Sequence, residues 1–273
     1  MIVTTHHAAK SFKKKEVLRD VELQLEENRI YGLVGRNGTG KSTLLSLLAG
    51  QARYDGDIKV FGHEPFDNEA VMDDIVFTGV DTPYPANWSF KAILDVASKR
   101  YPHWDQATAD HLLETFALDV KTSHSKASRG QRSMLAIVIA LAARAPLTLL
   151  DEPYLGLDVQ NRDLFYRELV AAQEANPRTI VIASHDLEAS AKLVDCYLVL
   201  RDGVIRTLES ERLDDALVSL TVANPVPPEL SDAALATESL GSSTRVVVRR
   251  GVADGSPVAL EDAVALAMGG SDV

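Results

Sequence analysis

The chain of 273 residues has one cysteine, few aromatic residues, no excess of basic residues and no long apolar run. A single cysteine, Cys196, excludes an internal disulfide bond, and its apolar neighbours indicate a small core residue. The longest apolar run, from Met134 to Ala143, is too short to cross a bilayer. The N-terminus also lacks the apolar segment of a secretory signal. We therefore expect a cytoplasmic chain that does not insert into a membrane and reaches one only through a partner.

The charge balance excludes further classes of protein. Lysine and arginine number 28 against 39 acidic residues, which gives a net charge of −11. A general nucleic-acid surface needs a basic face, so we expect no nucleic-acid partner. The histidines lack the spacing of a metal site, and no Ser-His-Asp hydrolase context is present. What remains is a globular chain of ordinary composition, long enough for one large domain and an appendage.

The most informative stretch is residues 35–42, Gly-Arg-Asn-Gly-Thr-Gly-Lys-Ser, which fits the phosphate-loop pattern G-x-x-x-x-G-K-[ST]. An apolar strand, Ile30–Val34, leads in, and a helix from Ser42 to Ala49 leads out. Glycines let backbone N–H groups point at phosphate oxygens, and the helix N-terminus adds its positive dipole end. Lys41 then reaches the β- and γ-phosphates and Ser42 holds Mg²⁺. A glycine-rich surface turn is the alternative interpretation.

Strands alternate with helices along most of the chain, which predicts an α/β fold with a parallel sheet. Strand-like stretches in residues 1–25 and 56–62 indicate a small antiparallel sheet beside it, with Phe12 between the first two strands. A helical insertion covers about residues 82–145. The alternation of strands and helices is interrupted by prolines beyond about Ser210. We therefore expect one domain over residues 1–209 and an appendage of unknown role over 210–273. Within the appendage, 241–243 is typical of a linker, and 259–268 indicates a short helix.

A second motif gives the phosphate loop a chemical partner. The buried strand Leu147–Leu150 ends in Asp151 and Glu152. A strand end fixes Asp151 where it can help hold Mg²⁺, and Glu152 can then act as the general base for an attacking water. The alternative is a pair of surface acids after a core strand. Thr148 places a hydroxyl in this apolar strand, and we expect it to be satisfied internally.

Together with Ser128-Arg129-Gly130-Gln131, Leu157-Asp158 and His185, these motifs resemble the nucleotide-binding subunit of an ABC (ATP-binding cassette) transporter. The resemblance covers about Ile2 to Leu208 and is strongest to the ABC-2-type export branch. It implies a P-loop NTPase (RecA-like) core and two subunits, a homodimer in preference to a heterodimer, that close head to tail on ATP. Hydrolysis of ATP then drives a separate membrane permease, with the chain peripheral on the inner face of the cell membrane.

The resemblance also assigns residues. Glu152 and His185 are catalytic, His185 through a hydrogen bond to the γ-phosphate. Phe12 stacks on adenine, with a strand-end core residue as the alternative. Asp158 contacts the partner subunit and can also cap a helix. The residues that hold ATP phosphates or Mg²⁺ in the same subunit are Gly35, Asn37, Gly38, Gly40, Lys41, Ser42, Thr43 and Asp151. Those that meet the partner's ATP are Ser128, Gly130 and Gln131.

Two departures from the family pattern matter. The signature loop reads Ala127-Ser-Arg-Gly-Gln131 where the family has Leu-Ser-Gly-Gly-Gln, so Arg129 replaces a glycine. The expected Q-loop glutamine is missing, and its place falls at Val80 or Asp81. Asp81 either approaches Mg²⁺ or is a plain turn residue.

A rival interpretation keeps the ATPase and removes the permease: a soluble ABC-type ATPase that acts as an assembly or regulatory module. The segment from Gly79 to Phe90 separates the two, because in the family this region docks a permease. Its aromatic residues, Tyr84 and Trp88, either form a docking surface or pack into the core.

Overall fold

The computed structural model describes residues 1–13, 15–184, 193–209, 217–258 and 264. Its centre is a six-stranded sheet in the order β5-β6-β7-β3-β8-β9, with only β9 antiparallel to its neighbour. The strands are β3 (Ile30–Val34), β5 (Ile75–Gly79), β6 (Leu147–Asp151), β7 (Thr179–Ser184), β8 (Cys196–Arg201) and β9 (Val204–Glu209). This confirms the predicted parallel core. Strands β3 and β7 are buried along their whole length, as expected for strands covered on both faces.

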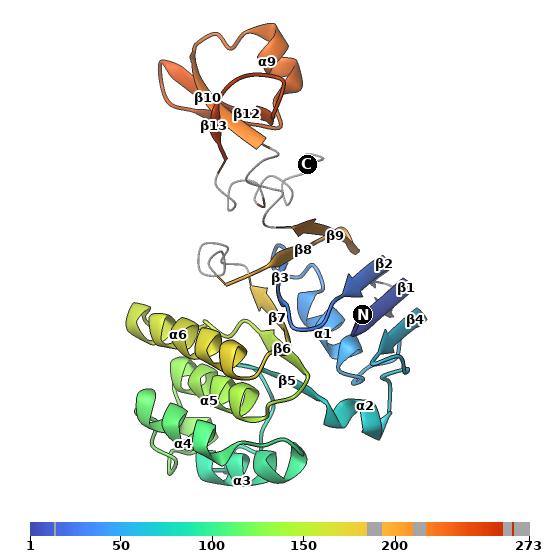
Figure 1. Ribbon diagram of the computed structural model, residues 1–273, viewed down its shortest axis with the longest axis vertical. Coiled ribbons are helices and arrows are strands. Elements are labelled where there is room, and N and C mark those ends of the chain that lie inside the picture. Colours follow the sequence, from blue (N-terminus) through green and yellow to red (C-terminus); the bar gives the residue numbers. More distant parts are fainter. Residues whose placement is uncertain (14, 185–192, 210–216, 259–263, 265–273) are drawn as a thin grey trace.

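Helices and a second sheet cover the two faces (Figure 1). Helix α1 (Lys41–Leu48) packs on one face, where Leu45 joins Val181 of the sheet in one apolar cluster. Helices α5 (Arg129–Ala142) and α6 (Val159–Ala175) cover the other face, where Ile137 joins Ile182 in a second cluster. Cys196 is fully buried in the sheet, as predicted, and burial raises the pKa of its thiol to about 12.

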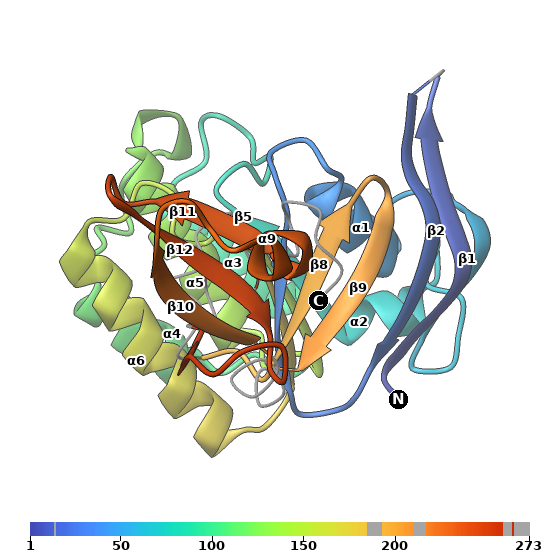
Figure 2. The same ribbon diagram turned by 90° about the horizontal axis from the view of Figure 1, so that it is seen from above.

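The predicted antiparallel sheet is present, in the order β2-β1-β4. It consists of β1 (Val3–Phe12), β2 (Lys15–Leu25) and β4 (Asp55–Val60). Strands β1 and β2 run side by side as a long hairpin that extends beyond the neighbouring elements (Figure 2). Phe12 is the last residue of β1 and not part of a connection between strands, because pairing continues from Phe12 to Lys15 across the tip.

The insertion contains α3 (Phe90–Arg100), α4 (Gln106–Thr115), a 3-10 turn (His124–Lys126) and α5, after the short helix α2 (Glu69–Asp73). The Ser89 hydroxyl caps α3 by accepting a hydrogen bond from Ala92 N, and the Asp105 carboxylate caps α4. Thr148 is satisfied internally, since its hydroxyl donates to Ala145 O at 3.4 Å.

The C-terminal residues form a separate four-stranded antiparallel sheet in the order β11-β12-β10-β13. Its elements are β10 (Leu217–Ala223), α9 (Pro228–Ala233), β11 (Ala236–Ser239), β12 (Ser243–Arg249) and β13 (Ser256–Pro257). The linker expected at 241–243 is wrong: these residues make a hairpin turn closed by Leu240 N donating to Ser243 O at 2.8 Å. Glycine and serine suit a tight turn as well as a linker. The helix expected over 259–268 lies outside the described residues, apart from residue 264.

Candidate nucleotide site

The phosphate loop is shaped by close backbone approaches. A Cβ atom on Gly35 would lie 2.5 Å from Leu200 O, and one on Gly40 would lie 2.9 Å from a methyl carbon of Val17. Gly40 is the N-cap of α1 with φ 111°, a left-handed conformation that favours glycine. No side chain of the described residues caps this helix. The first amides of α1 are therefore left for a ligand, which is the arrangement that phosphate oxygens need.

Lys41 joins the phosphate loop to the catalytic acid. Its side chain is 6% exposed, and its Nζ donates to Gly35 O at 2.8 Å. The same nitrogen lies 3.7 Å from Oε1 of Glu152. The ammonium group thus lies between the loop and the end of β6, where a negative phosphate chain can replace the carbonyl contact.

Asp151 and Glu152 stand at the carboxyl end of β6. Burial raises the pKa of the Asp151 carboxyl, while a hydrogen bond with Ser42 and the charge of Lys41 partly oppose this. Its Oδ1 atom is buried without a hydrogen-bond partner among the described residues. A divalent cation held between Ser42 and Asp151 would satisfy that oxygen, so these residues fit Mg²⁺. Glu152 has φ 49°, a strained conformation for this residue type, held by its N–H donating to Ala183 O at 2.9 Å.

A cavity of about 460 Å³ brings these groups together. It is lined by Ser42, Gln51, Phe77, Gly79, Val80, Asp81, Thr82, Pro83, Asp151, Glu152 and Leu155. Three metal-site candidates and the candidate base thus share one cavity. Of the two Q-loop positions, Val80 is buried, while the Asp81 side chain is 82% exposed at the cavity wall. Asp81 is therefore the residue of that pair with a free approach to a bound cation.

The start of α5 is built in a different way. The Ser128 hydroxyl accepts from Gln131 N at 3.1 Å, and the Gln131 side chain accepts from Ser128 N at 2.9 Å, a capping box. A Cβ atom on Gly130 would lie 2.4 Å from Gly156 O. Gly130 therefore lets the helix start pack directly on the loop before Asp158.

Arg129 and Asp81 contact each other. Arg129 Nη2 lies 3.7 Å from Asp81 Oδ2, with the two side chains 55% and 82% exposed. The residues at which the sequence departs from the expected signature loop and Q-loop are thus a pair in space. Sequence reasoning treated them separately.

A family model described as "ABC transporter" matches residues 18–155, half of the chain and the part that holds the phosphate loop, Asp151 and Glu152. The chain belongs to the ABC transporter family. Its relatives include the ABC transporter ATP-binding protein YtrB of Bacillus subtilis (strain 168), 28% identical over 224 residues, 81% of this chain and 77% of that protein. An ABC transporter ATP-binding protein of Bacillus thuringiensis subsp. konkukian (strain 97-27) is 33% identical over 216 residues, but the chain spans only 39% of its length.

Solved structures agree on the fold. One is a dimeric ATP-binding cassette in a post-hydrolysis state, bound to ADP and Pi, with a TM-score of 0.65 and 20% sequence identity. The match covers 76% of this chain and 98% of that cassette. The expectation of an ATP-binding, ATP-hydrolysing ABC subunit with a P-loop NTPase core is confirmed. No helix in the described part of the chain is both long and apolar enough to span a membrane.

The remaining ABC-type site residues lie in different surroundings. Phe12 is 52% exposed, which excludes a core role, and Lys10 Nζ lies over its ring, 5.1 Å from the ring centre. Asp158 caps α6 by accepting from Asn161 N at 2.8 Å. Asn37 and Gly38 are exposed and Thr43 half-buried on the phosphate loop and first turn of α1. His185 lies outside the described residues, directly after the buried Ser184 that ends β7.

Two features of this ABC site escaped sequence reasoning. Gln51 lines the catalytic cavity from the far end of α1, where it follows the helix-ending Gly50. Gly156, with φ 82°, forms the loop against which Gly130 packs. The triplet Leu155-Gly156-Leu157 signals a turn, but nothing in its spacing to Gly130 indicates a contact.

Proposed function

We propose that this chain binds MgATP between two copies of itself, hydrolyses it with Glu152 as general base, and drives a separate membrane permease from the cytoplasmic face. The observation that carries the proposal is the shared cavity of Ser42, Asp81, Asp151 and Glu152 beside an uncapped helix start. In this proposal, the family's domain is residues 1–209, and 210–273 is an appendage.

The chain's residues divide the chemistry as follows. Amides of the phosphate loop and Lys41 orient the phosphates. Ser42 and Asp151 hold Mg²⁺, with Asp81 nearby, and the cation when bound supplies positive charge beside the transferring phosphoryl group. Glu152 takes a proton from the attacking water. At the same time the oxygen of the water bonds to the γ-phosphorus, and ADP leaves. His185 is proposed to hydrogen-bond the γ-phosphate.

The homodimer is proposed from the start of α5 and from the loop beside it. Ser128, Gly130 and Gln131 would meet the γ-phosphate of the other copy's ATP. Val159, 76% exposed directly after Asp158, leaves an apolar surface at the proposed dimer contact. Phe12 would stack on adenine. We assign the chain to the ABC-2-type export branch on its signature loop alone.

A soluble ABC-type ATPase without a permease is the second candidate. Tyr84 and Trp88 favour it, because both are half-buried and pack against the core cluster. Burial raises the pKa of Tyr84 to about 12, and its ring meets that of His124 with centres 5.3 Å apart. Apart from Asp81 at the cavity wall, the residues of this segment that remain exposed are Pro83, Pro85, Ala86 and Asn87. A docking surface therefore consists of this turn and not of the aromatic side chains.

The two candidates are separated by affinity purification of the full chain from detergent-treated native membranes. We expect an integral membrane protein to co-purify with wild type and to be lost from a Pro85→Glu, Asn87→Glu double variant. Basal ATP hydrolysis should persist in that variant. Lys59→Glu, at an exposed position on β4, is the matched control and should retain the partner. A wild-type chain that never co-purifies with a membrane protein makes the soluble ATPase the better assignment.

A further inference from the structure

A second polar cavity, of about 360 Å³, lies at the edge of the six-stranded sheet opposite the phosphate loop. Its walls come from residues that precede parallel strands: Asn28 before β3, Asp74 before β5, Arg144 before β6 and Arg178 before β7. The phosphate loop follows the other end of β3. The length of a strand of this size, about 20 Å, therefore separates this cavity from the nucleotide site.

Arg178 is the unusual residue in this cavity. It is 3% exposed, and its Nε and Nη2 atoms are both buried without a hydrogen-bond partner among the residues that the structure describes. Burial, with a smaller contribution from the charge of Arg144, lowers the pKa of Arg178 to about 10. A buried charge without a counter-ion is costly, and native proteins keep such groups where a ligand completes them.

The two unsatisfied atoms lie on the same edge of the guanidinium group. The N–H bonds of Nε and Nη2 run nearly parallel, which matches two oxygens of a carboxylate or phosphate group. Arg144 adds a second positive charge to the cavity, with its Nη1 3.3 Å from Asp105 Oδ2 and its side chain 41% exposed. Asn28 and Asn176 add side-chain amides to the wall.

The wall also carries acids, so it is not a simple basic patch. Glu27 and Asp74 line the cavity, and Asp74 Oδ1 lies 3.7 Å from His103 Nε2. Neither forms an ion pair with Arg178. Mixed charges of this kind fit a small organic molecule that has one oxyanion group and further hydroxyl or amine donors.

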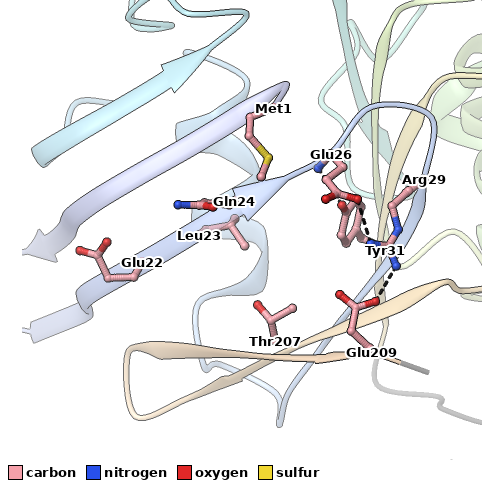
Figure 3. Close-up of a pocket in the computed structure, with 9 residues that line it drawn as sticks. All are labelled: Met1, Glu22, Leu23, Gln24, Glu26, Arg29, Tyr31, Thr207 and Glu209. Carbon is pink, nitrogen blue, oxygen red and sulfur yellow. Dashed lines mark hydrogen bonds and ion pairs between the residues drawn. The ribbon is translucent and has the colours of Figure 1, made fainter. Parts of the chain in front are cut away.

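Another cavity in the chain contains an arginine that is paired with carboxylates of the chain (Figure 3). That cavity, of about 380 Å³, contains Arg29, which lies 2.6 Å from Glu209 and 3.1 Å from Glu26. Both oxygens come from the chain itself. Arg29 needs no ligand, whereas the Nε–Nη2 edge of Arg178 has no acceptor in the part of the chain that the structure describes.

We propose that the cavity at the starts of β3, β6 and β7 binds a small molecule through a phosphate or carboxylate group, held by the Nε–Nη2 edge of Arg178 with Arg144 as the second charge. The site is separate from the ATP site and does not depend on hydrolysis. Its volume of about 360 Å³ suits a small metabolite.

The experiment is calorimetric titration of the purified full chain with inorganic phosphate and with malonate. Because the phosphate loop also binds phosphate, every protein carries Lys41→Ala. We expect at least one probe to bind this background, and Arg178→Met to weaken that binding by about 30-fold or more. Arg144→Met should weaken it by about threefold to tenfold, because the Arg144 side chain is exposed and already contacts Asp105. Arg29→Met, which removes the paired arginine of Figure 3, is the matched control and should bind as the background does.

Folding is checked by thermal unfolding without ligand. Arg178→Met removes a buried charge and keeps an unbranched apolar side chain, so its midpoint should not fall. If it does unfold, Arg178→Lys, which keeps the charge and loses the fork, carries the test with a weaker affinity than the background. Stronger binding of phosphate assigns a phosphate ester, and stronger binding of malonate assigns a carboxylate. A background that binds neither probe, or equal binding by the Arg178 and Arg29 variants, overturns the proposal.

Discussion

Helices α1 and α5 begin in opposite ways, although both starts are proposed to face phosphate. Helix α1 follows Gly40 and has no side-chain cap, whereas α5 follows Ser128 and closes a capping box with Gln131. The first amides of α1 are thus available to a ligand in the single chain. At α5, the chain itself already uses some of those donors and acceptors. One loop is ready for nucleotide, and the other must exchange an internal hydrogen bond for one to a partner's ATP.

The same difference explains which loop departs from the family pattern. In the phosphate loop, a side chain at Gly35 or Gly40 would collide with neighbouring atoms, so the backbone dictates the residue. In the signature loop, only Gly130 is confined in this way, against Gly156. The Arg129 side chain is 55% exposed and lies near Asp81, so the fold tolerates it. The predictions below test this contrast, from the largest expected effect to the smallest.

Removing the ammonium group of Lys41 tests whether open amides alone hold nucleotide. In Lys41→Ala we expect the affinity for ATP to fall by about 10²-fold, because a buried charge that meets the phosphates is lost. Equilibrium binding of a fluorescent ATP analogue measures this. Lys91→Ala, which removes an exposed lysine on α3, is the control. Equal affinities for the two variants would show that the phosphate loop holds nucleotide without Lys41.

Replacing the candidate base tests the chemistry and leaves the loop intact. Glu152→Gln keeps size and hydrogen bonding, so ATP binding should persist while turnover falls by roughly 10²-fold or more. A longer-lived dimer in the presence of ATP should accompany the loss, as measured by light scattering. Turnover near that of wild type would remove Glu152 from the role of base.

Adding one carbon to the signature loop tests its packing on the loop of Gly156. In Gly130→Ala the new Cβ would lie 2.4 Å from Gly156 O, so the start of α5 must move. We expect a loss of about 1–3 kcal/mol in the free energy of unfolding and weaker ATP-driven dimerisation, with ATP binding by the monomer unchanged. Lys126→Ala, at an exposed position just before the loop, is the control. If monomer binding of ATP also fails, the two loops are not independent.

Much of the fold and of the nucleotide site was predictable from the sequence. The phosphate loop, the helix that follows it and the strand that ends in Asp151 are all local patterns, and local patterns determine local structure. The order of motifs then identified the family, and with it the sheet. Residue boundaries followed within a few positions, as in α1, which spans Lys41–Leu48 where Ser42 to Ala49 was expected.

The rest depends on contacts between segments far apart in the chain. The pairing of Arg129 with Asp81 joins residues 48 positions apart in sequence, and no alternation or spacing encodes it. The burial of Arg178 follows from four strand starts meeting at one edge of the sheet. The turn at 241–243 was misjudged for a related reason: glycine and serine suit a linker and a turn alike, and only strand pairing distinguishes them.

The pH dependence of stability tests the electrostatics beside the phosphate loop. Burial raises the pKa of Asp151 in the folded chain. As pH rises, the unfolded chain therefore releases this proton first, and the free energy of unfolding falls until the folded chain has also released it. Asp151→Asn lacks this loss. The measurement is urea unfolding at about pH 4 and about pH 7. Between the lower and the higher pH, the free energy of unfolding should fall less, or rise more, in the variant than in wild type. Parallel pH profiles would mean that burial does not disfavour the charged carboxylate.

The smallest effect concerns the link between the two departures from the family pattern. Arg129→Gly and Asp81→Gln restore the residues expected at these positions, and a double-mutant cycle isolates the interaction between them. Because both side chains are exposed, the coupling energy should be only about 0.2–1 kcal/mol and should shrink at high salt.

The readout is the ATP hydrolysis rate at several protein concentrations, which reports dimer formation. Arg129 must leave Asp81 if it is to meet a partner's phosphate, so Asp81→Gln alone should favour the dimer slightly, while Arg129→Gly removes the benefit. Additive effects at low salt would mean that the ion pair has no part in closure and that each residue acts alone.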